Sequence, residues 1–186
     1  MKVHVILTIN TGPMGERITI YHGSGGKLTK HLISDLFAKR FCMTDPLTDS
    51  AIINFQGRTL AFTTDSYVVD PVFFPGGNIG KLAVCGTVND LAVSGAVPAY
   101  IAASFIIEEG FPVNDLDSIV CSMAEEASKA GVKIVTGDTK VVEKSKCDKI
   151  FITTSGTGIL AKKNKDISTG RKIKPGDRLI INGAIG

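Results

Sequence analysis

The order of the apolar segments constrains this chain most, because segments with a helical period alternate with segments typical of strands. A first helix of three to four turns is predicted after residue 27, where apolar residues recur at a period of about 3.6. Two more are predicted over about 80–94 and from Asp115 to Gly131, a residue that can end a helix. The apolar faces comprise Leu28, Leu32, Ile33, Leu36, Phe37 and Phe41 in the first helix, and Leu116, Ile119, Val120, Met123, Ala124 and Ala127 in the last.

The segments between these helices are typical of β-strands. Residues 51–55 and 58–64 flank Gln56-Gly57, which predicts a hairpin. Further strands are expected over 98–107, 132–136 and 149–159, the last with two glycines, Gly156 and Gly158, that can mark a bulge. Hairpins mixed with helices favour a two-layer α+β domain over a doubly wound parallel sheet.

One face of such a sheet would lack cover, because the helices pack against the other face. The uncovered residues would be a set such as Ile101, Ala103, Phe105, Ile150 and Ile152, or the residues that alternate with them. A second subunit is the simplest cover. The sequence therefore predicts a homodimer that associates through the sheet.

Composition excludes several classes of protein. With 44% hydrophobic and 21% charged residues the chain has a globular balance, and no apolar run approaches the roughly 18 residues of a membrane span. Its first ten residues are too short for a secretory signal. The four cysteines lie tens of residues apart without zinc-ligand spacing. We therefore expect a cytoplasmic protein with no membrane partner.

The net charge of +3 is concentrated near the end of the chain. Residues 162–186 carry seven basic and two acidic residues, whereas residues 1–161 carry 14 basic and 16 acidic residues. A nucleic-acid-binding protein would spread basic residues over its folded body, usually among aromatic ones. This body is slightly acidic and the chain is only 6% aromatic, so nucleic acid is not an expected partner.

The glycine-rich segment before the first helix is a candidate phosphate cradle. It follows His22 and consists of Gly23, Ser24, Gly25, Gly26 and Lys27. Glycines allow backbone amides to face an anion, the helix start adds a favourable dipole, and the lysine adds a cation. The segment lacks the spacing of a Walker A loop, so a flexible turn remains the alternative. His22 is a further, weaker candidate for a phosphate contact.

Four aspartates are candidate ligands for a hard cation: Asp49, Asp65, Asp90 and Asp138. Each lies at the end of an apolar element or in a helix of small apolar residues, where an unpaired carboxylate is costly to desolvate. Any one of them alone could be a turn or capping residue. Together with the glycine-rich segment they predict a site for Mg²⁺ and a nucleotide. Lys140 is a catalytic candidate that could neutralise a transferring phosphoryl group, and the alternative is a surface lysine in a loop.

Several motifs resemble those of one family, HypE, the carbamoyl dehydratases of hydrogenase maturation. The motifs are the HGSGGK segment, DSYVVDPVFFPGGNIGKLAVCGTVNDLAVSGA at 65–96, EEGFP at 108–112 and TGDTKVVE at 136–143. The resemblance covers about 17–160. The wider superfamily includes aminoimidazole ribonucleotide synthetase, selenophosphate synthetase and thiamine-monophosphate kinase, and it shares the scattered aspartates but not the FFPGG and GDTKVVE wording.

The resemblance implies a PurM-like amino-terminal domain of the AIR synthase-related superfamily, with a mixed sheet, helices on one face and dimerisation through the sheet. It implies ATP-dependent conversion of a cysteine-borne thiocarboxamide to thiocyanate for the cyanide ligands of [NiFe] hydrogenase. The implied partners are the carbamoyltransferase HypF and the HypC–HypD iron scaffold. The four aspartates would hold Mg²⁺, residues 23–27 would close over the phosphates, and Asn89 and Lys140 would contact ATP.

The family continues into a second domain and a carboxy-terminal acceptor cysteine, whereas this sequence stops at Gly186. We expect an extension over 1–16, an ATP-binding domain over 17–161, a linker over 162–177 and the start of a carboxy-terminal domain over 178–186. The alternative for the last segment is a strand that packs back on the main sheet. Two alternative functions stay open, a catalytically silent nucleotide-binding or dimerisation module and a small-molecule phosphotransferase.

Overall fold

The computed structural model describes residues 17–43, 47–181 and 183, which belong to two compact units, Met1–Pro46 and Leu47–Gly186. Each unit is described by itself. In the described ranges, every helix is too short or too polar to cross a bilayer. The predicted extension over 1–16 lies outside the described residues.

The first unit consists of a short 3₁₀-helix, η1 (Ile20–Gly23), and a continuous helix over residues 27–41. The long helix has a π-helical middle and comprises α1 (Lys27–His31), η2 (Leu32–Ala38) and α2 (Lys39–Phe41). The predicted first helix is therefore confirmed. The rings of Phe37 and Phe41 stack one turn apart, with centroids separated by 6.1 Å. No residue of this helix is fully buried.

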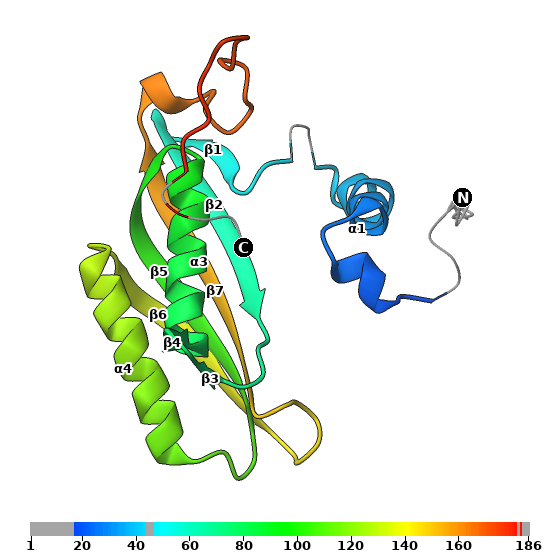
Figure 1. The fold of residues 1–186 in the computed structure, drawn as a ribbon, viewed down its shortest axis with the longest axis vertical. Coiled ribbons are helices and arrows are strands. Elements are labelled where there is room, and N and C mark those ends of the chain that lie inside the picture. The colour runs from blue at the N-terminus through cyan, green and yellow to red at the C-terminus, as the bar shows by residue number, and fades with distance from the viewer. Residues whose placement is uncertain (1–16, 44–46, 182, 184–186) are drawn as a thin grey trace, which may run out of the picture. The chain divides into compact units, whose positions relative to one another are not determined.

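The second unit is a two-layer α+β domain, which confirms the predicted fold class (Figure 1). Its five-stranded sheet has the order β1-β2-β7-β5-β6. The pair β5–β6 is parallel and the other pairs are antiparallel, so the sheet is mixed. The strands are β1 (Ala51–Phe55), β2 (Arg58–Tyr67), β5 (Ala96–Glu108), β6 (Lys133–Val142) and β7 (Ile150–Leu160).

Two helices, α3 (Ile79–Val93) and α4 (Val113–Lys129), cover one face of this sheet (Figure 1). The small hairpin of β3 (Phe73–Phe74) and β4 (Gly77–Asn78) leads into α3. Asn78 caps α3, since its side chain accepts hydrogen bonds from the backbone N–H groups of Gly80 and Lys81. The FFPGG turn is therefore a structural connection. The main core consists of Ile79, Ala83, Val84, Ile101, Ala103, Ile107, Ile119, Met123, Ile150 and Ile152 with smaller neighbours.

Glycines allow α3 to approach its neighbours closely. A Cβ atom at Gly156 of β7 would lie 2.6 Å from the Thr87 side chain, and one at Gly80 would lie 2.4 Å from the Ile119 carbonyl oxygen. The α3 side chains therefore pack directly on the β7 backbone, and the backbones of α3 and α4 approach each other closely. The bulge expected in β7 lies instead in its partner β5, between Pro98 and Tyr100 and opposite Gly158.

The register decides which residues face the helices. Ile101, Ala103, Ile150 and Ile152 are buried beneath them, and Phe105 packs against the same core. The residues that alternate with these form the opposite surface, called here the open face, which the described residues of the unit leave uncovered. Its members include Phe62, Tyr100, Ala102, Ser104, Asp138, Phe151 and Thr153.

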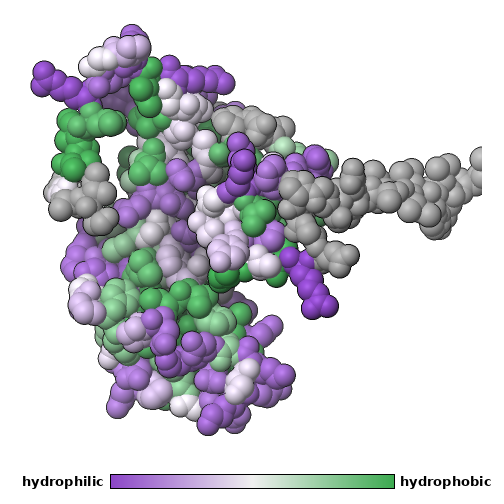
Figure 2. Space-filling model, turned by 45° about the vertical axis from the view of Figure 1, so that its right-hand side comes forward, coloured by the Kyte–Doolittle hydropathy of each residue, from purple (hydrophilic) through white to green (hydrophobic). Residues whose placement is uncertain are grey.

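One end of the open face is apolar. Ile53, Phe55, Phe62 and Ile159 lie on neighbouring strands there, and each is at least 40% exposed. Hydrophobic side chains also reach the surface elsewhere, most densely over the lower part of the view in Figure 2. Such a concentration of exposed apolar groups is typical of a surface that associates with another surface.

The structure corrects three local predictions. β6 extends to Val142 instead of ending at residue 136, because parallel pairing with β5 continues past Gly137. α4 begins at Val113, two residues earlier than expected. Val120 and Ala124 of its predicted inward face are exposed, because α4 contacts the sheet through Ile119, Met123 and Ala127.

The predicted linker begins with a short 3₁₀-helix, η3 (Lys162–Asn164), that is tied to the domain. The Asn164 side-chain amide donates a hydrogen bond to the Gly95 carbonyl oxygen, 2.8 Å away. Residues 178–181 form no strand, and Leu179 and Ile180 are more than 90% exposed. The alternative that this segment packs back on the main sheet is therefore wrong for these residues.

The contact of Gly80 with α4 gives a stability prediction. Alanine normally stabilises a helix by about 1 kcal/mol relative to glycine. Gly80→Ala should instead lower the free energy of unfolding by about 1–3 kcal/mol, because the added methyl group overlaps the Ile119 carbonyl. Urea denaturation measures the change. Ser118→Ala, at an exposed position of α4, is the matched control and should be close to neutral; a more stable Gly80→Ala protein would contradict this packing.

Candidate functional site

Three of the predicted aspartates lie near one another at the junction of β2 and α3. Asp65 is in β2, Asp90 is in α3, and Asp49 comes just before β1. The Thr63 hydroxyl connects Asp49 and Asp90, because its oxygen lies 2.9 Å from Asp90 Oδ2 and 2.8 Å from the Asp49 carbonyl oxygen. The Ser50 hydroxyl adds a hydrogen bond to the Asp90 carbonyl oxygen. We call Asp49, Asp65 and Asp90 the carboxylate trio.

The electrostatics of the trio favour a cation. Burial raises the pKa of Asp90, and the negative charges of Asp65 and Asp49 raise this pKa further, although the hydrogen bond from Thr63 lowers it. Three carboxylates that interact in this way repel one another when all are ionised. A cation bound among them would remove the repulsion.

Tyr67 is a member of this site that the sequence analysis missed. Its hydroxyl donates a hydrogen bond to Asp65 Oδ2, at 3.1 Å, and lies 3.4 Å from the Thr87 hydroxyl of α3. Burial raises the pKa of Tyr67 to about 12, with a contribution from the neighbouring Asp65 charge. A signal was present in the sequence, because residues two apart in a strand share a face of the sheet.

Asp138 does not join the carboxylate trio within one chain. It pairs with Ser104 in the register of β5 and β6, and this places it on the open face. β6 is also three strands from β2, a separation of about 14 Å at the usual strand spacing. The alternative for Lys140 was a surface lysine in a loop. The residue lies instead in β6, on the same face as Asp138.

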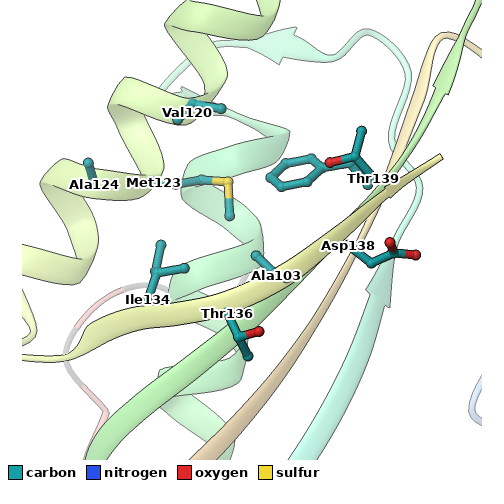
Figure 3. A pocket seen from close by; sticks show the side chains of 10 residues that line it. Ala103, Val120, Met123, Ala124, Ile134, Thr136, Asp138 and Thr139 are labelled. Atoms are coloured by element: carbon teal, nitrogen blue, oxygen red, sulfur yellow. The ribbon is translucent and has the colours of Figure 1, made fainter. Parts of the chain in front are cut away.

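A pocket of about 580 Å³ opens between α4 and the edge strand β6 (Figure 3). Met123, Ala103 and Ile134 gather at its apolar wall, whereas the Asp138 carboxylate points away from them. The pocket is lined mainly by apolar side chains, and its lining includes the Asp138 carboxylate but no basic residue, which disfavours phosphate there. It is separate from the carboxylate trio.

Asn89 also lies away from the trio, although it adjoins Asp90 in the sequence. It lines a pocket of about 260 Å³ between α3 and α4, together with Cys85, Glu126 and Lys129. Burial and the nearby Glu126 charge raise the pKa of the Cys85 thiol, so this cysteine is not an activated nucleophile. A nucleotide contact from Asn89 stays a prediction.

The glycine-rich segment belongs to the first unit. Gly25 has a positive φ of 76°, its N–H donates to the Thr29 hydroxyl at 3.0 Å, and Ser24 donates to the Tyr21 carbonyl oxygen. Part of the predicted cradle is thus already engaged within its own loop. Residues 23–27 remain exposed, and no side chain of the described residues caps the helix N-terminus at Gly26.

His22 supplies an orphaned donor beside this segment. The residue is 5% exposed, and its Nδ1 accepts a hydrogen bond from the Thr19 backbone N–H at 3.1 Å. Nε2 therefore carries the proton, and it is buried without a hydrogen-bond partner among the residues that the structure describes. A buried donor without a partner is costly, and a phosphate oxygen would satisfy it.

These observations fit Mg²⁺ and phosphates better than a metal caged by protein alone. Within the described part of the chain, no three His, Cys, Asp or Glu residues are placed to hold an ion by themselves. Mg²⁺ commonly takes one or two carboxylates and fills its other positions with water and substrate phosphates. The trio can supply such carboxylates. The metal role of each of the four aspartates stays a prediction.

The chain is similar to known proteins in sequence and in fold. Residues 47–160 match the family described as AIR synthase related protein, N-terminal domain. The carbamoyl dehydratase HypE of Rhodobacter capsulatus is 53% identical over 176 residues, which are 92% of this chain and 51% of that protein. The chain spans about half the length of such curated relatives.

Two crystal structures of relatives are also similar. A HypE–HypF complex matches with a TM-score of 0.64 and 57% identity, over 70% of this chain and 43% of the other. HypE in complex with ATP matches with a TM-score of 0.56 and 49% identity, over 79% of this chain and 44% of the other.

The raised pKa of Asp90 gives a testable pH dependence. Because this pKa is higher in the folded than in the unfolded chain, stability falls as the pH rises from the ordinary value of 3.8 through the raised value. Without Mg²⁺, Asp90→Asn should therefore be more stable than the wild type at pH 7, and the gain should vanish below pH 3.8. The asparagine oxygen can still accept the Thr63 hydrogen bond.

Urea denaturation at the two pH values measures this effect. Asp117→Asn, at an exposed position of α4, is the control and should show no such pH-dependent gain. A gain for Asp90→Asn that is equal at both pH values would show that the carboxylate charge is not its cause.

Proposed function

Because the chain belongs to the AIR synthase related family through residues 47–160, we propose that it is the ATP-binding domain of a carbamoyl dehydratase. The observation that carries the proposal is the carboxylate trio, whose mutual repulsion favours a cation. The similarity to HypE over 92% of the chain supports the choice of activity. A HypE relative that binds ATP supports the choice of nucleotide.

The candidate residues have separate proposed roles. Asp49, Asp65 and Asp90 would hold Mg²⁺ together with phosphate oxygens, which would offset the desolvation of the carboxylates. Residues 23–27 would bind phosphate with backbone N–H groups and the Lys27 ammonium, and His22 Nε2 would donate to a phosphate oxygen. ATP would supply the phosphoryl group that activates the carboxamide oxygen of the thiocarboxamide, with release of ADP. Loss of that phosphate and of the two nitrogen-bound protons would leave the thiocyanate.

Asp138 and Lys140 require a second copy of the chain in this proposal. Both lie on the open face, whereas the trio lies on the side of the sheet that faces the helices. We propose that the chain dimerises through the open face, which brings these two residues to the nucleotide of the partner subunit. Association would also cover the apolar end formed by Ile53, Phe55 and Phe62.

The acceptor thiol is proposed to lie in the carboxy-terminal region of the longer relatives. Among the described cysteines, Cys85 and Cys147 have raised pKa values because of burial and neighbouring acidic groups, so neither favours a thiolate. Cytoplasmic localisation and the carbamoyltransferase and iron-scaffold partners belong to the same proposal. The HypE–HypF complex of a relative supports the first of these partners.

A nucleotide-binding module without turnover is the competing function. Both functions require Mg²⁺-dependent ATP binding. They differ in the release of ADP and phosphate when the chain is incubated with ATP and a carbamoylated cysteine peptide. Release would favour the enzyme, and its absence would favour the module.

Substitution in the trio tests the nucleotide site. Asp65→Ala or Asp90→Ala should reduce Mg²⁺-dependent ATP binding by at least about 100-fold while the fold persists, because each removes a proposed oxygen ligand. Isothermal titration calorimetry with and without EDTA measures the binding, and circular dichroism checks the fold. Asp117→Ala is the control. Unchanged affinity in both trio variants would remove the metal site from the proposal.

The oligomeric state tests the open face. Light scattering at micromolar concentration should give twice the mass of the 19.7 kDa chain. Phe62→Glu should shift it to the monomer, because a charge would be buried among apolar side chains. Val113→Glu places the same charge at an exposed position on α4 and should leave the dimer intact. A monomeric wild-type protein would contradict the dimer.

A further inference from the structure

The Tyr67 side chain is packed tightly between β2 and α3. A Cβ atom at Gly86 of α3 would lie only 2.3 Å from the Tyr67 hydroxyl oxygen, so the phenol end lies directly against the helix backbone. The ring packs against the main core. The hydroxyl is thus fixed in position where only glycine leaves room for it.

Hydrogen-bond accounting shows where the Tyr67 proton goes. The Thr154 hydroxyl donates to the Ala83 carbonyl oxygen at 3.1 Å, so its oxygen can only accept from Thr87, 2.5 Å away. The single Thr87 proton is thereby used. The 3.1 Å contact of Tyr67 with the Asp65 carboxylate is shorter than its 3.4 Å contact with Thr87, and a charged acceptor makes the stronger hydrogen bond.

Packing therefore holds the phenol, and the phenol anchors the carboxylate. Thr87 and Thr154 are both fully buried and bond to each other, so Thr87 has no proton to donate to the phenol. Contact with Gly86 and with the main core fixes the phenol on one side, and its hydrogen bond holds Asp65 on the other. Outer groups of this kind set the orientation of a metal-binding carboxylate.

From these contacts we infer that Tyr67 is a positioning residue, which orients the Asp65 carboxylate for the cation of the carboxylate trio. The inference rests on the proposed function, since it concerns the same site. Tyr67 does not touch the nucleotide in this role. It acts only through Asp65, and Gly86 is required because it leaves space for the phenol.

The test compares Tyr67→Phe with Ser118→Ala, which removes a hydroxyl from an exposed position of α4. ATP is titrated into each protein by calorimetry at several Mg²⁺ concentrations and in EDTA. Tyr67→Phe should need about tenfold more Mg²⁺ for half-maximal binding, in the range usual for loss of such an outer group. Its residual ATP affinity in EDTA should equal that of the wild type, and Ser118→Ala should match the wild type throughout.

A double-mutant cycle shows whether the effect passes through Asp65. In an Asp65→Asn background, Tyr67→Phe should cause little further loss, because the group that Tyr67 orients has already changed. Gly86→Ala is a second variant for the case in which Tyr67→Phe does not fold. The alanine methyl group would push the Tyr67 hydroxyl out of its position, although the hydroxyl itself is still present. This variant should therefore produce the same shift in Mg²⁺ requirement.

Three results would overturn the inference. The first is an unchanged Mg²⁺ requirement in Tyr67→Phe. The second is a loss of ATP affinity in EDTA as large as the loss in Mg²⁺, and the third is an effect of Tyr67→Phe that is as large in the Asp65→Asn background as in the wild type. Absence of Mg²⁺-dependent ATP binding by the wild-type chain would instead contradict the proposed function, and the role of Tyr67 would fall with it. The wild-type titration thus separates the two failures.

Discussion

The close packing of α3 on the sheet is the contact on which the rest of this domain depends. Gly156 lets the helix approach β7 so closely that the side chains of Thr87 and Leu91 occupy the space of a missing Cβ. The same approach places Asp90 within hydrogen-bond distance of Thr63 on β2. It also brings Thr87 to Thr154 and Tyr67. The core and the candidate site are therefore built by one helix–sheet contact.

This arrangement puts stability and function in opposition at the carboxylate trio. Burial and like charges raise the pKa of Asp90, and an ionised carboxylate in such surroundings disfavours the folded state. The surrounding core of Ile79, Ile101, Ile119 and Ile152 offsets that cost. Strain of this kind is expected where a protein prepares a site for a cation, because the ligand removes the repulsion when it binds.

The open face gives the same sheet a second functional surface. Strand alternation directs the residues next to each buried side chain to this surface, so Ser104 and Asp138 face away from the helices that cover Ala103. The carboxylate trio thus lies on one side of the sheet, and Asp138 and Lys140 lie on the other. Under the proposed function, only association of two chains lets all four aspartates serve one nucleotide.

Much of the fold was determined by the sequence itself. The helical period over residues 27–41 and the Gln56-Gly57 turn are local signals, which depend on neighbouring residues alone, and the structure confirms both. The residue sequences of the motifs likewise indicated the family. The length of β6 was not predictable, because its extension depends on pairing with β5, more than 30 residues away.

The composition of the site was decided by tertiary structure. The sequence singled out Asp49, Asp65, Asp90 and Asp138 as equals. The packing of α3 on the sheet brings the first three together, whereas strand register places the fourth on the opposite face. Tyr67 was overlooked because its role depends on Gly86 and Thr87 in a distant helix. Residue types and local spacing determine which groups are available, whereas long-range pairing determines which of them meet.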